Sequence, residues 1–79
     1  MIVQLFAVVD KLTNVHDGPH KAINEGQFLR GFSDAVKDER SDISKHPEDF
    51  YAVHLGSFDD STGTVIGLES GPVRIASGS

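Results

Sequence analysis

The chain has 79 residues, a formal net charge of −5 and no cysteine. That length indicates one domain over residues 1–79, and the lack of cysteine excludes disulfide bonds and thiolate metal ligands. The excess of acidic residues argues against a monomer that coats nucleic acid by neutralising phosphates over its whole surface.

Residues 2–10 are almost all apolar and rich in β-branched side chains. A run of this length without polar alternation is typical of a central strand buried on both faces. The segment is too short to cross a membrane and has no basic region or cleavage site of a secretory signal. We therefore expect a first strand and no membrane association.

Residues 11–24 predict a long connection, because Thr13-Asn14 and Asp17-Gly18-Pro19 are typical of turns. His16, Asp17 and His20 have a spacing that could bind a metal. However, no cysteine or third histidine nearby completes a recognisable ligand set. We therefore expect solvated loop histidines, with neither a metal nor a cofactor.

A helix is predicted over about residues 25–38. Asn24 is a favourable N-cap, and Gln27 stands three residues later, as in a capping box. Phe28 and Phe32 recur at helical spacing, so both are expected to face the core rather than to stack on nucleobases.

The segment after this helix begins with His46-Pro47, and Pro47 is suited to the first position of a short helical turn. Glu48 and Asp49 would lie at the positive end of that turn. Residues 50–58 then predict a strand with two largely apolar faces. His54 within it is expected to be a packed or hydrogen-bonded sheet histidine rather than a catalytic base.

Residues 59–63 predict a hairpin with Gly63 in the left-handed conformation, followed by a returning strand over residues 64–68. Residues 73–76 could add an edge strand, and residues 77–79 are expected to fray. The acidic pairs at the two ends of the strand 50–58 would lie about 30 Å apart, too far to form one site.

This order of elements predicts an α+β fold, a small β-α-β-β domain whose antiparallel or mixed sheet has one helix packed on it. If the first two strands are parallel neighbours, their crossover should be right-handed. One short helix covers only one face of two strands that are apolar on both sides. We therefore expect a homo-oligomer in which a second copy covers the remaining face.

No motif in the sequence marks a catalytic centre. The glycines have neither phosphate-loop nor dinucleotide spacing, and no nucleophile elbow is present. We expect that the protein is not an enzyme. A surface for single-stranded nucleic acid would combine aromatic side chains with some of the seven lysines and arginines.

Three segments resemble the small nonstructural protein of gokushovirus-type Microviridae, which are bacteriophages with single-stranded DNA genomes. These are Lys45-His46-Pro47-Glu48-Asp49-Phe50, the run Leu55 to Gly63 with its Gly56-Ser57-Phe58-Asp59-Asp60 block, and the helical run Phe28 to Val36. The resemblance covers about residues 1–76. It departs from the family pattern between Lys11 and Asn24, where the family often has an apolar Pro-Phe segment.

The resemblance implies a nonstructural accessory protein in the host cell cytoplasm that binds single-stranded DNA or the viral replication complex. It would act in genome replication or in the switch to single-strand synthesis and packaging. The family provides no assigned catalytic residue. The residues we expect to contact nucleic acid are Arg30, Lys45, His46 and Tyr51.

Two other functions remain open from the sequence. One is a protein–protein adaptor that docks on the replication initiator or procapsid, because exposed acids favour a basic partner. Its contact residues would be Glu48, Asp49, Asp59 and Asp60. The other is a metal-dependent nuclease, for which activity would be lost in EDTA.

Overall fold

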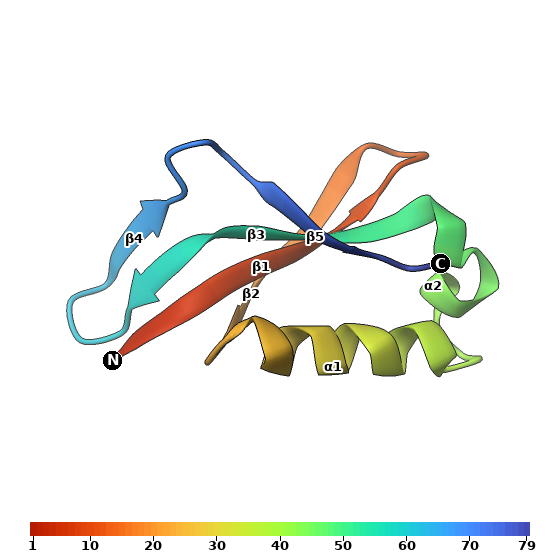
Figure 1. Ribbon diagram of the computed structural model, residues 1–79, viewed down its shortest axis with the longest axis horizontal. Coiled ribbons are helices and arrows are strands. Elements are labelled where there is room, and N and C mark those ends of the chain that lie inside the picture. Colours follow the sequence, from red (N-terminus) through yellow and green to blue (C-terminus); the bar gives the residue numbers. More distant parts are fainter.

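The computed structural model describes residues 1–79 as a five-stranded sheet with one long helix along one face (Figure 1). The elements in chain order are β1 (Ile2–Asp10), β2 (Val15–Ala22), α1 (Glu25–Lys37), α2 (Asp42–Lys45), the 3₁₀ helix η1 (Pro47–Asp49), β3 (Phe50–Asp59), β4 (Thr64–Gly67) and β5 (Val73–Ser77). The predicted α+β class is therefore confirmed. None of the helices has the length and apolar composition needed to span a lipid bilayer.

The sheet has the order β2-β1-β3-β4, and β5 pairs with β3 beside β4. Every strand pair is antiparallel, including β1 with β3, so no parallel crossover exists. The predicted β-α-β-β order requires correction, because β2 lies between β1 and α1, where we expected only a connection.

Strand β2 escapes sequence prediction because its side chains carry almost no strand signal. Its sequence is VHDGPHKA, and seven of its eight residues are exposed. The ladder to β1 shifts register between Phe6 and Val8, where Gly18 and Pro19 are accommodated as an irregularity in β2. Backbone pairing along the edge of β1, rather than a buried apolar face, therefore defines this strand.

Helix α1 begins as the sequence predicts. The Asn24 side chain accepts a hydrogen bond from the Gln27 backbone N–H at 2.9 Å. The Gln27 Oε1 in turn accepts from the Ile23 N–H at 2.7 Å, one residue before the position of a standard capping box. Phe28 stacks on Phe6 of β1 with ring centroids 4.6 Å apart, which confirms that the aromatic residues of α1 pack in the core.

The sheet has a buried centre on both faces although only one face carries the helix. On the face under α1, Phe6 is fully buried. On the opposite face, which we call the helix-free face, Ala7, Val9 and Val53 form a buried cluster with Tyr51 and Leu55 packed against it. We expected a second copy of the chain to cover this face. The single chain already buries the middle of it.

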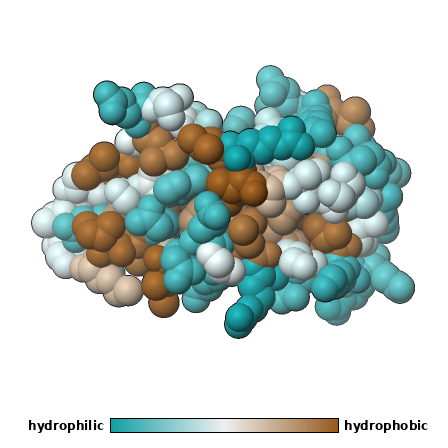
Figure 2. Space-filling model, viewed as in Figure 1, coloured by the Kyte–Doolittle hydropathy of each residue, from teal (hydrophilic) through white to brown (hydrophobic).

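The exposed apolar residues lie instead at the ends and edges of the molecule. Figure 2 shows hydrophobic residues scattered between hydrophilic ones, including several at the end that carries β4. The large hydrophobic residues with exposed side chains are Met1, Ile2, Leu12, Val15, Ile23, Val65, Ile66 and Val73.

The predicted turns around β3 are confirmed. Pro47 occupies the start of η1, with Glu48 and Asp49 in its first turn. Gly63 closes the β3–β4 hairpin with φ of +79°. The segment 77–79, expected to fray, is hydrogen-bonded at its beginning: Ser77 ends β5, and the Gly78 N–H donates to the Phe50 carbonyl at 2.9 Å.

Candidate functional site

The helix-free face gathers cationic side chains around one aromatic ring. The Phe6 side chain points toward α1, because its ring stacks on Phe28. Side chains alternate between the two faces of a strand, so Val9, three positions later, points away from the helix. Residues opposite each other in an antiparallel ladder share a face. The register therefore assigns four further residues to the helix-free face, and these are His16 and Lys21 of β2, Tyr51 of β3 and Arg74 of β5.

Tyr51 is the centre of this face. The Arg74 guanidinium carbon lies 4.6 Å from the Tyr51 ring centroid, and the Lys11 Nζ lies 5.8 Å from it. The Lys11 ammonium also donates to the Glu48 carbonyl at 3.1 Å, which holds it beside the ring. Both cations lie over the ring, and a guanidinium plane stacks nucleobases as an aromatic ring does, so the group of Tyr51, Arg74 and Lys11 can hold a base and a phosphate together.

The acidic residues of the sheet lie on its other side. Asp10, Asp17 and Asp59 are the acids carried by strands, and the register pairs them with Phe50, Val8 and Ile2, respectively. Those positions belong to the face that carries α1. An acidic protein thus presents a helix-free face whose strand-borne charges are all positive.

The structure does not bring the four predicted nucleic-acid contacts together. Tyr51 alone lies on the helix-free face. Arg30 lines a shallow hollow with Asn24 and Gln27 at the start of α1. Lys45 and His46 line a different hollow near α2, together with acids that include Asp10, Asp42 and Asp49.

Sequence reasoning missed Lys11 and Arg74 as neighbours of Tyr51. Both stood among the seven cations of the chain, but nothing in their spacing relates them to Tyr51. Arg74 reaches the ring because β5 returns to pair with β3, and this pairing links residues 19 to 26 positions apart. Only the tertiary structure provides that signal.

The two acidic corners lie at opposite ends of β3, as predicted (Figure 1). At the β3–β4 hairpin, the N-terminal ammonium donates to Asp60 Oδ1 at 2.8 Å. This hydrogen bond lowers the pKa of the Asp60 carboxyl below its usual value. At the other end, His46, Glu48 and Asp49 bring ligand atoms within 4.8 Å of one another, on an exposed turn whose geometry Pro47 explains without a metal.

His54 has the structural role predicted for it. Its ring stacks on Phe6 with centroids 5.0 Å apart. Its Nε2 lies 2.8 Å from Gln4 Oε1 and 3.1 Å from the Gly56 carbonyl oxygen. These contacts anchor the ring within the sheet on the side of α1.

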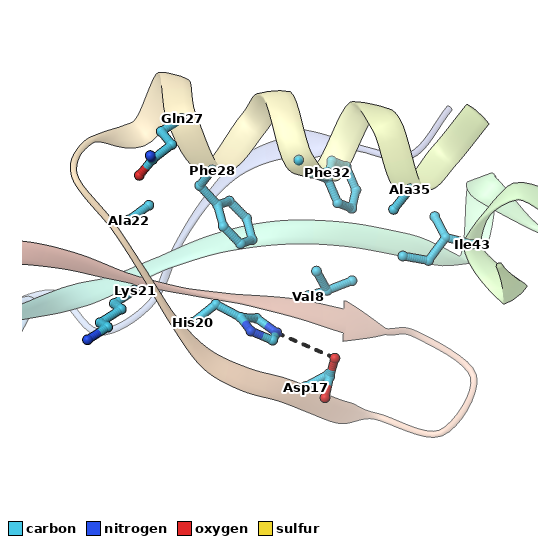
Figure 3. A pocket seen from close by; sticks show the side chains of 11 residues that line it. Val8, Asp17, His20, Lys21, Ala22, Gln27, Phe28, Phe32, Ala35 and Ile43 are labelled. Atoms are coloured by element: carbon cyan, nitrogen blue, oxygen red, sulfur yellow. Dashed lines mark ion pairs between the residues drawn. The ribbon is translucent and has the colours of Figure 1, made fainter. Parts of the chain in front are cut away.

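A second candidate site is an open cleft of about 500 Å³ between α1 and β2 (Figure 3). Phe28, Phe32 and Val8 line its apolar side, and the His20–Asp17 pair, 3.5 Å apart, lines the other. His16 lies on the opposite face of β2, so the two histidines predicted on a loop do not converge on one metal. The cleft can accept a flat apolar group with a polar edge.

Gly31 lines this cleft, and its replacement by alanine is expected to stabilise the protein. A Cβ at Gly31 would meet no atom within 4 Å, so close packing does not require glycine there. Alanine is favoured over glycine inside a helix by about 1 kcal/mol. We expect a higher thermal midpoint by circular dichroism; an unchanged or lower midpoint would show that the helix needs glycine for another reason.

Comparison with known proteins supplies one match. A family model described as the phage ORF5 protein matches residues 3–79, which is nearly the whole chain. No curated protein and no solved structure matches it. The match confirms the phage origin that the resemblance of the sequence implied. The chain belongs to the phage ORF5 protein family.

Proposed function

We propose that this phage accessory protein binds single-stranded DNA through its helix-free face. The observation that carries the proposal is the Tyr51 ring with Arg74 and Lys11 over it, on a face without strand-borne acids. Proteins that bind single strands without sequence preference use this combination of aromatic platform and basic groove. The net charge of −5 does not oppose it, because the acids carried by strands lie on the other face of the sheet.

The size of the interaction follows from the groups on this face. Stacking a base on an aromatic side chain contributes about 1–3 kcal/mol. Lys11, Lys21 and Arg74 are the cations available to phosphates on this face. Neutralising three phosphates of a single strand predicts a slope of about −2 in a plot of log affinity against log salt.

The biological setting proposed is that of the gokushovirus-type Microviridae in the host cell cytoplasm. There the protein would cover single-stranded viral DNA, or join the replication complex, during genome replication or the switch to single-strand synthesis and packaging. A modest, sequence-independent affinity suits such a role, because the same protein has to bind anywhere along the genome.

The test is fluorescence anisotropy of a labelled oligonucleotide over a salt series. Tyr51→Leu keeps an apolar side chain against the buried cluster but removes the aromatic ring, and we expect affinity to fall by about 5-fold to 100-fold. Tyr51→Phe retains the stacking surface and should bind nearly as the parent does. Binding that is absent, or insensitive to salt, would rule out the proposal.

Arg30→Gln serves as the second control, because Arg30 lies on α1, away from the helix-free face. If it weakens binding while Tyr51→Leu does not, the DNA follows the helix side instead. Retained binding by Arg30→Gln, with loss in Arg74→Gln, would locate the strand on the helix-free face.

The adaptor function is a second candidate, favoured by the exposed acidic turn at η1. His46 and Glu48 there are exposed, and a basic partner could dock without moving the sheet. Glu48→Gln combined with Asp49→Asn should then abolish capture of a basic viral protein and leave DNA binding unchanged. The nuclease hypothesis stays a prediction, tested by the effect of EDTA on DNA cleavage.

A further inference from the structure

We infer that two copies of this chain pair through the outer edges of β4 into an antiparallel, two-fold symmetric dimer with one continuous sheet. Strand β4 pairs only with β3, and it forms one end of the sheet (Figure 1). All four of its residues are exposed, with Val65 at 64% and Ile66 at 59%. A free strand edge with exposed apolar side chains is a template for another strand.

The small core indicates that the strand paired with β4 belongs to a second copy of the chain rather than to a transient partner protein. Only nine of the 79 residues are buried, and no disulfide supports them. Chains of this size with so little core commonly gain stability from oligomerisation.

The composition of the edges selects β4 over the alternatives. The sequence of β4 is TVIG, so identical strands meet without like-charge repulsion. The opposite edge, β2, carries Asp17, Pro19 and Lys21, which are residues that prevent strand addition. Strand β5 would place two copies of Arg74 near each other.

The pairing of two β4 strands also affects how the helix-free faces of the two copies are arranged. The importance of this arrangement depends on the function proposed above. A two-fold axis perpendicular to the sheet at Val65 sets Val65 opposite its own counterpart, and Thr64 opposite Ile66 of the second copy. Side chains alternate along a strand, so this register keeps both helix-free faces on the same side. The two Tyr51 sites then lie on the same side of the dimer, toward its opposite ends, so one long DNA strand can reach both.

Sedimentation equilibrium of the full chain tests the inference. We expect a mass twice the 8.5 kDa of one chain. In Val65→Arg, two arginines would face each other at the axis, and we expect the dimer dissociation constant to rise by at least about 100-fold. Val65 is exposed in the single chain, so the circular dichroism spectrum should remain unchanged.

Val15→Arg is the matched control, because Val15 is 56% exposed and lies at the other edge of the sheet. This variant should remain dimeric. The inference would be overturned if the parent protein is folded and monomeric over a 100-fold range of concentrations. It would also be overturned if Val15→Arg dissociates the dimer and Val65→Arg does not. Anisotropy on the same samples separates the two proposals: a dimer without DNA binding contradicts only the function, and a monomer that binds DNA contradicts only the dimer.

Discussion

Replacing Phe6 by alanine is expected to lower the free energy of unfolding by about 3–5 kcal/mol, close to the whole stability of a small domain. Phe6 is fully buried, and its ring stacks on both Phe28 of α1 and His54 of β3. Its loss would leave a cavity at the junction of helix and sheet. Phe28 also stacks on His20 of β2, but only Phe6 extends this row of rings from α1 to β3.

Urea denaturation followed by circular dichroism measures this effect. Leu12→Ala is the control, because Leu12 is 78% exposed and its truncation should change stability by less than about 0.5 kcal/mol. Phe6→Leu should fall between the two, since it keeps part of the buried volume. A loss below about 1 kcal/mol in Phe6→Ala would contradict the central position of this ring.

Replacing Gly56 by alanine is the second change with a large expected effect. The ladder between β1 and β3 shifts register here: Leu5 pairs with Gly56 and Phe6 with His54, so Leu55 is the extra residue of a bulge. Gly56 has φ of +156°, and an added Cβ would collide with the Ile66 carbonyl oxygen and lie 2.8 Å from the Gly67 Cα. Because both obstacles are backbone atoms of β4, we expect a loss of about 3 kcal/mol or more.

Hydrogen exchange of the β4 amides in Gly56→Ala would identify where the loss occurs. These amides should exchange faster than those of α1, because β4 has to separate from β3 to accept the Cβ. Gly63→Ala is the control: it has a positive φ of +79° but no atom within 4 Å of the added Cβ. It should cost only about 1–2 kcal/mol, the penalty of the left-handed conformation. Equal losses in the two variants would mean that collision with β4 is unimportant.

Local chemistry made several elements predictable. Asn24 and Gln27 mark the start of α1 because their side chains satisfy free N–H groups within four residues of themselves. Pro47 marks η1 because its ring already has the φ of a first helical residue. Gly63 marks the β3–β4 hairpin, because the turn requires a positive φ at this position and glycine adopts one readily.

Long-range pairing limited the prediction of the candidate site. Strand β2 has an exposed, charged sequence that reads as a loop, and only hydrogen bonds to β1 make it a strand. Tyr51 was predicted as a nucleic-acid contact, but the cations beside it come from the end of β1 and from β5. Arg30, Lys45 and His46, chosen with it, lie elsewhere on the molecule.

The sequence by itself determined the α+β class, the limits of α1, the turn at Pro47 and the two apolar strands at the centre of the sheet. Each depends on side chains and backbone groups only a few residues apart, whose preferences are visible in the order of the residues. The tertiary structure decided the place of β2, the antiparallel pairing of β1 with β3, and the approach of Arg74 and Lys11 to Tyr51. These features arise when segments distant in the chain satisfy each other's backbone hydrogen bonds, and a periodic pattern of side chains does not specify which segments will meet.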